Sequence, residues 1–157
     1  MRTFGYIFAT AALIGLAFVT VPNISSTNRT NKENDTHLQG AHGVQFQKIT
    51  FAQALQKSKT ENKLIFMNVY AVWCGPCKLL KDRTFQSDKV ANLLNSNFIN
   101  IDVDAEKGEG IELAQRYNVE AHPLMLLINS EGKVVKSILG YRKDNQLVDE
   151  VKDFVRK

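Results

Sequence analysis

The chain has 157 residues, of which 44% are hydrophobic, and its 20 Lys and Arg residues only slightly outnumber its 16 Asp and Glu residues. The basic residues form no cluster along the sequence, and the aromatic residues form no ladder. Both observations argue against nucleic acid as a partner. Only two cysteines are present, too few for a structural disulfide framework or a four-thiolate zinc site. We therefore expect one small globular domain with no metal and no other cofactor.

Residues 1–21 form an apolar segment with a positively charged start. The stretch from Phe4 to Val21 is uncharged, and Arg2 precedes it. As a helix it would extend about 27 Å, slightly less than a bilayer core of roughly 30 Å. The pattern is typical of an export signal, and it fits a cleaved signal peptide and an uncleaved membrane anchor equally well. In both cases we expect the remaining chain outside the cytoplasm, periplasmic or tethered to the inner membrane on that side.

Residues 22–43 are predicted to form a disordered polar linker. They are dominated by Asn, Ser, Thr and charged residues, so they cannot bury enough apolar surface to offset the conformational entropy of the chain. His37 and His42 lie in this segment with no cysteine nearby, and we interpret them as solvated side chains rather than metal ligands. The globular domain is therefore expected to span residues 44–157.

The domain is predicted to begin with a short strand, a capped helix and a buried strand. The first strand is expected at residues 46–49. Thr50 is a favourable N-cap residue, and Gln53 completes the capping-box pattern of a helix that continues to Asn62. The nearly continuous apolar run at residues 64–70 predicts a strand that is buried on both faces.

The later elements alternate between helices and strands. We expect a helix at 74–85, a second helix at 88–95 capped by Ser87, a strand at 98–103 and a helix at 111–117. Strands at 123–128 and 134–139 form a predicted hairpin around Gly132, and an amphipathic helix closes the chain at 145–155. The order βαβα followed by ββα predicts an α/β fold with a central mixed sheet flanked by helices.

Both cysteines lie in the hexapeptide WCGPCK, residues 73–78, between a predicted strand and a predicted helix. This arrangement suits a dithiol redox centre. Cys74 falls at the start of the helix, where unpaired backbone N–H groups and the helix dipole favour a thiolate. Cys77 lies about one turn into the helix, close enough to form a disulfide with Cys74.

The hexapeptide is similar to the active site of the thioredoxin family, and the similarity extends over roughly residues 44–157. Residues 69–72 resemble the family's strand that leads into the active site. Pro123 stands where thioredoxins carry a cis-proline facing the disulfide, and Gly140 stands where the family commonly has a glycine. The resemblance implies a thioredoxin fold and thiol–disulfide oxidoreductase activity.

The two sulfurs are expected to have different roles. Cys74 is the predicted attacking thiolate, because it is N-terminal and expected to be the more exposed, and Cys77 is the predicted resolving thiol. Gly-Pro is the dipeptide of thioredoxin itself, whose potential of about −270 mV leads us to expect a reductant. The residues expected to line the active site and contact substrate are Trp73, Gly75, Pro76, His122 and Pro123.

Two residues depart from the family pattern. Thioredoxins usually carry a buried Asp, which assists proton transfer at the resolving thiol, at the position that Asn68 occupies here. A neutral amide can form hydrogen bonds but cannot act as a base near neutral pH. His122 directly precedes the expected cis-proline, and a protonated imidazole there would favour the Cys74 thiolate. Each residue also fits a purely structural interpretation.

Within the family, residues 70–74 and 84–90 resemble exported thioredoxin-like proteins, including the C-terminal domain of DsbD-type interchange proteins. We expect a monomeric, exported reductant of protein disulfides that receives electrons from a membrane protein and is attached to the membrane if residues 4–21 are retained. The alternatives are a disulfide oxidant or isomerase of the same fold, a non-catalytic binding module, and a copper chaperone that holds Cu(I) with both thiolates.

Overall fold

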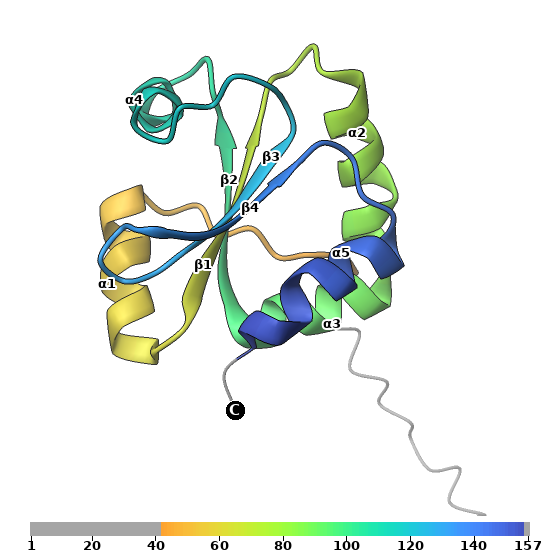
Figure 1. Ribbon diagram of the computed structural model, residues 1–157, viewed down its shortest axis with the longest axis horizontal. Coiled ribbons are helices and arrows are strands. Elements are labelled where there is room, and N and C mark those ends of the chain that lie inside the picture. Colours follow the sequence, from red (N-terminus) through yellow and green to blue (C-terminus); the bar gives the residue numbers. More distant parts are fainter. Residues whose placement is uncertain (1–41, 156–157) are drawn as a thin grey trace, which may run out of the picture. The chain divides into compact units, whose positions relative to one another are not determined.

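The computed structural model describes residues 42–155. The predicted signal or anchor at 1–21 and nearly all of the predicted linker at 22–43 lie outside the described residues. Helices lie on both sides of a four-stranded sheet (Figure 1). Its strands are β1 (Leu64–Tyr70), β2 (Phe98–Asp104), β3 (Leu124–Ile128) and β4 (Val134–Leu139), in the order β2-β1-β3-β4. Because β1 runs parallel to β2 and antiparallel to β3, the sheet is mixed, which confirms the predicted fold class.

Each face of the sheet has its own hydrophobic core. One face is covered by α1 (Phe51–Glu61) and α4 (Glu109–Arg116), and the other by α2 (Gly75–Asp82), α3 (Asp88–Asn97) and α5 (Asp144–Val151) (Figure 1). Successive side chains of a strand point to opposite faces. Met67 of β1 therefore packs in the α1 core and Phe66 in the α2 core. The same alternation directs Asn68 towards the α2 face.

The capped helix and the buried strand that follows it are confirmed. The Thr50 hydroxyl accepts the Gln53 N–H at 3.2 Å, and the Gln53 side chain accepts the Thr50 N–H at 2.9 Å. These reciprocal bonds satisfy donors that the first turn of α1 leaves unpaired. The bounds of β1 match the apolar run at 64–70, because the strand is central and its side chains are buried on both faces.

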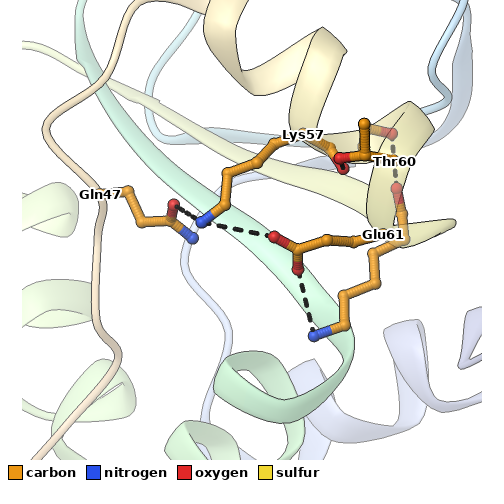
Figure 2. Close-up of polar contacts among 6 residues, drawn as sticks. Gln47, Lys57, Thr60 and Glu61 are labelled. Carbon is orange, nitrogen blue, oxygen red and sulfur yellow. Dashed lines mark hydrogen bonds and ion pairs between the residues drawn. The ribbon is translucent and has the colours of Figure 1, made fainter. Parts of the chain in front are cut away.

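The predicted strand at 46–49 is wrong. This segment has no regular secondary structure, although the Gln47 N–H donates to the carbonyl of Asn100 at 2.8 Å. Gln47 also accepts a hydrogen bond from Lys57 of α1 at 2.8 Å, and Lys57 pairs with Glu61, as Figure 2 shows. The side-chain hydrogen bond from Lys57 of α1 to Gln47 thus helps to hold residues 46–49 in place, although they lack the repeated backbone hydrogen bonds of a strand.

The predicted helix at 74–85 is interrupted. The structure ends α2 at Asp82 and turns at Arg83 into the 3-10 helix η1 (Thr84–Gln86). The Thr84 hydroxyl donates to the carbonyl of Arg142 at 2.6 Å, and the Phe85 ring packs edge-on against Phe66 at 6.1 Å between centroids. These long-range contacts favour a change of direction that local helix propensity does not encode.

The remaining boundaries differ from prediction by a few residues. The helix after Ser87 extends to Asn97 rather than 95, and the Ser87 side chain forms no capping bond. The last helix ends at Val151 and continues as η2 (Lys152–Phe154). Gly43, assigned to the linker, is buried with φ at 88°. Within residues 42–155, none of the helices combines the length and the apolar character needed to cross a bilayer.

Candidate active site

The two cysteines meet where β1 passes into α2. Cys74 is the N-cap residue of α2, and Gly75 and Pro76 open the first turn. The Cys74 N–H donates to the carbonyl of Ala71 at 3.1 Å, which fixes the turn between strand and helix. Cys74 and Cys77 are joined by a disulfide with an S–S distance of 2.03 Å and a Cα–Cα distance of 5.3 Å. The structure thus brings the predicted sulfur pair together as a disulfide.

The electrostatic setting of the pair favours a charge on Cys74 rather than on Cys77. The Cys77 N–H donates to the Cys74 sulfur at 3.2 Å. In the reduced protein, this donor and the start of the helix both stabilise a thiolate at Cys74. The expected difference in exposure is absent in the disulfide form, in which Cys74 is 4% and Cys77 6% exposed.

Trp73 lies at the surface, with its indole held on two sides. The residue is 67% exposed. Its Nε1–H donates to Glu106 Oε1 at 2.9 Å, and its ring meets the His122 ring edge-on at 6.1 Å between centroids. Such a fixed, exposed aromatic side chain offers apolar contact area at little entropic cost. Glu106 was not predicted as a site residue, because it lies in the loop after β2, far from the motif in sequence.

His122 and Pro123 approach the motif from the start of β3. The peptide bond between them is cis, as the family resemblance implies. Pro123 is buried, and the partly buried His122 contacts Trp73. Among the described residues, no side chain or backbone group forms a hydrogen bond with the buried His122 Nδ1. The expected influence of His122 on the Cys74 thiolate stays a prediction.

A pocket of about 240 Å³ lies beside Cys77 on the α2 face of the sheet. We call it the Cys77 pocket. Asn68 opens onto it, as the resemblance to thioredoxins leads one to expect, and so does Asp102 of β2, which the sequence did not indicate. The complete lining is Asn68, Tyr70, Ala71, Val72, Cys77, Lys78, Lys81, Phe85 and Asp102.

Asp102 and Asn68 form a hydrogen-bonded pair across two neighbouring strands. They are register partners in the parallel β1–β2 pair, and Asn68 Nδ2–H donates to Asp102 Oδ1 at 2.7 Å. Burial raises the pKa of Asp102, while the Asn68 bond and the charge of Lys81 oppose the increase. Burial also raises the pKa of Tyr70, and the negative charge of Asp102 adds to that effect.

The sequence model of the Thioredoxin family matches residues 43–153. The chain belongs to the thioredoxin family. Thioredoxin H-type of Fagopyrum esculentum is 35% identical over 95 residues, which cover 60% of this chain and 76% of that protein. The thiol:disulfide interchange protein DsbD of Campylobacter jejuni strain RM1221 is 28% identical over 102 residues, which cover 64% of this chain and 18% of DsbD.

Among solved structures, a candidate disulphide isomerase from Bacteroides thetaiotaomicron is 40% identical, with a TM-score of 0.65. The match covers 74% of this thioredoxin-family chain and 97% of that protein. The oxidised C-terminal domain of Neisseria meningitidis DsbD shares the fold, at 24% identity and a TM-score of 0.56, over 66% of this chain and 90% of that domain. The protein is thus a thioredoxin-fold thiol–disulfide oxidoreductase, and Cys74 and Cys77 are its disulfide-forming pair. Within residues 42–155, no group of three or more His, Cys, Asp or Glu side chains is placed to hold a metal ion.

Proposed function

We propose that this protein is an exported reductant of protein disulfides that works through a mixed disulfide at Cys74. The observation that carries the proposal is the position of the Cys74 sulfur, which caps α2, accepts the Cys77 N–H and is bonded to Cys77. In the reduced protein, the helix start and this N–H donor would both favour the thiolate form of a sulfur in this position. The thiolate is the form that attacks disulfides.

The reaction has two steps. The Cys74 thiolate first attacks one sulfur of the substrate disulfide, and the other substrate sulfur leaves as a thiolate. The Cys77 thiol then loses its proton and attacks the Cys74 sulfur, and the second substrate thiolate leaves as its bond to Cys74 breaks. The substrate has gained two electrons, and the protein has become the Cys74–Cys77 disulfide form.

The surface around the sulfurs is the proposed substrate site. Trp73 is 67% exposed beside the disulfide, and Gly75 and Pro76 are exposed at the start of α2. We propose that an extended segment of the substrate lies across these residues and the strand entry at His122 and Pro123. The arrangement suits a flexible protein chain because Trp73 offers an exposed aromatic contact next to the sulfur pair.

Export and a membrane electron donor are also parts of the proposal. The apolar segment from Phe4 to Val21 supports export, and the similarity to DsbD supports work in thiol–disulfide interchange. A reductant outside the cytoplasm needs reducing equivalents from inside the cell, so we propose a membrane protein as its donor. We propose a monomer, because one compact domain carries the whole site.

The test is to trap the mixed disulfide in the native host. Cys77→Ser removes the resolving thiol, so Cys74 should remain linked to its substrates and to its donor, which mass spectrometry of the non-reduced adducts identifies. The matched control is Cys74→Ser, which should trap nothing. Adducts formed by Cys74→Ser but not by Cys77→Ser would contradict the assigned roles, and purely cytoplasmic adducts would contradict export.

A second candidate function is disulfide isomerisation. It is favoured by the 40% identity to the candidate disulphide isomerase from Bacteroides thetaiotaomicron. The two functions differ in reduction potential, which is about −270 mV for thioredoxin and about −180 mV for protein disulfide isomerase. Equilibration with glutathione measures this potential. Efficient refolding of scrambled ribonuclease, together with a potential at the oxidising end, would favour the isomerase.

A further inference from the structure

The resolving step requires a proton to leave Cys77. A thiol must become a thiolate before it attacks a disulfide. Cys77 is 6% exposed in the structure, so bulk water has little direct access to its sulfur. The neutral amide of Asn68 cannot take up the proton. A nearby base in contact with solvent in the Cys77 pocket would therefore speed this step.

Asp102 is the carboxylate that opens onto this pocket. Its side chain and Cys77 both line the pocket, whose volume of about 240 Å³ is ample for water molecules. Asp102 reaches it because β2 is parallel to β1 and in register with it, so that Asp102 stands beside Asn68 on the α2 face. A water molecule in this polar pocket can carry a proton between the Cys77 sulfur and the Asp102 carboxylate.

Asn68 holds the carboxylate in place without blocking its protonation. Its Nδ2–H donates to Asp102 Oδ1 at 2.7 Å, while its buried Oδ1 has no hydrogen-bond partner among the described residues. A rotation of the amide would exchange donor and acceptor. Asn68 can therefore donate to the ionised carboxylate and accept from the protonated one. A lysine in the same place would stabilise only the ionised form.

The charges that face Asp102 come from three elements. Lys78 and Lys81 of α2 line the pocket, Tyr70 lines it from β1, and Asp104 follows along β2. Burial and Asp104 raise the pKa of Asp102, and the Asn68 bond and Lys81 lower it. The net effect raises the pKa of Asp102, so this carboxylate holds a proton more readily than an exposed Asp would.

We propose that Asp102 accepts the proton of Cys77 through pocket water, with Asn68 as the residue that positions its carboxylate. The proposal rests on the mixed-disulfide mechanism proposed above. As Cys77 attacks the Cys74 sulfur, its proton passes through water to Asp102, and the substrate thiolate leaves with the electron pair of the broken bond. When a dithiol donor later reduces the Cys74–Cys77 disulfide, protonated Asp102 returns the proton to the departing Cys77 thiolate.

The two steps can be timed separately with 5,5′-dithiobis(2-nitrobenzoate) and the reduced protein. The first thionitrobenzoate is released when Cys74 attacks, and the second when Cys77 resolves the adduct. We expect Asp102→Asn to slow the second release at neutral pH by about ten- to a hundred-fold, which is at or below the lower end of typical acid–base effects because a thiol is already a moderate acid. The first release should be unchanged. In the parent the second release should fall with the protonation of Asp102, and in the variant this limb of the pH profile should be missing.

Two further variants separate proton transfer from a structural effect. Asp82→Asn removes an exposed carboxylate of α2 that does not line the pocket, and it should leave both releases at the parent rates. The double exchange Asn68→Asp with Asp102→Asn keeps one acid and one amide in the same hydrogen-bonded pair, and it should restore the fast second release.

The outcomes of these experiments separate the role of Asp102 from the mixed-disulfide mechanism. An Asp102→Asn protein with the parent's second release and pH profile overturns the role of Asp102, as does equal slowing of both releases. A double exchange that stays slow in the second release also overturns it. Release of fewer than two thionitrobenzoates per reduced parent protein contradicts the mixed-disulfide mechanism itself, so the two failures are distinguishable.

Discussion

Asn68→Asp would place two carboxylates in contact and so tests the Asn68–Asp102 pair directly. The amide nitrogen lies 2.7 Å from Asp102 Oδ1, so the charge centres of two carboxylates would lie roughly 4 Å apart. With an effective dielectric constant of about 20, two unit charges at that distance repel by about 4 kcal/mol. This energy corresponds to about three pKa units. We expect the pair to retain one proton through neutral pH, as coupled carboxylates do.

The pH dependence of stability follows from this shared proton. In the folded variant one acid has a raised pKa, whereas in the unfolded chain both titrate near pH 4, at about 3.9. Between these values the folded state binds more protons, so the free energy of unfolding falls as pH rises. Relative to the parent, the loss should be small at acid pH and approach about 4 kcal/mol near neutral pH.

Urea denaturation at a series of pH values measures this loss. The matched control is the double exchange of Asn68 and Asp102, which carries a single carboxylate and should follow the parent curve. An Asn68→Asp curve that runs parallel to the parent at all pH values would refute the reasoning, because the two side chains would then not share one buried site.

Three further predictions concern the surroundings of the site. Phe85→Ala should lower the free energy of unfolding, measured in urea, by about 3–5 kcal/mol. The reason is that Phe85 is 2% exposed and packs edge-on against Phe46 and Phe66. If Phe85→Ala lowered stability no more than Phe85→Leu does, this packing would be contradicted. Glu106→Ala should free the Trp73 indole, lower its fluorescence anisotropy and raise KM for a protein disulfide, whereas Glu106→Gln keeps an acceptor and should resemble the parent. The Lys136 hydrogen bond lowers the pKa of Glu150. This carboxylate therefore stabilises the fold above its unfolded pKa, and the stabilisation is lost as pH falls. Glu150→Gln should flatten the acid limb of the curve of stability against pH, and an unchanged limb would contradict this role of Glu150.

The elements that the sequence predicted well are those fixed by local signals. The Thr50–Gln53 capping box marks the start of α1, and the apolar run at 64–70 matches the bounds of β1. The strand at 134–139 was also placed correctly. At residues 46–49 the local pattern fits a strand, but no strand forms, and Gln47 is instead held by single hydrogen bonds to α1 and β2. The break after Asp82 depends on Thr84 bonding to Arg142, a contact across the fold.

The residues of the candidate site likewise divide into those that local sequence signals indicate and those that only the fold brings together. The sulfur pair, Trp73 and the cis-proline lie at motif positions, so their residue types and spacing indicate them. Asp102 could not be found in this way, because its place beside Asn68 depends on the register of two parallel strands. One signal was available: the fifth residue is polar in both seven-residue strands, LIFMNVY and FINIDVD. Glu106 left no such signal, since only the folded loop brings it to Trp73.

The N-cap position of Cys74 has a practical consequence for the choice of an inactive variant. Serine is among the preferred residues at a helix start, and its hydroxyl can accept the N–H that the sulfur now accepts. Alanine offers no acceptor, and the loss of a capping acceptor at such a position lowers stability by about 1 kcal/mol. A serine replacement thus silences the chemistry and leaves the scaffold of α2 intact, whereas an alanine replacement would confound lost reactivity with a frayed helix.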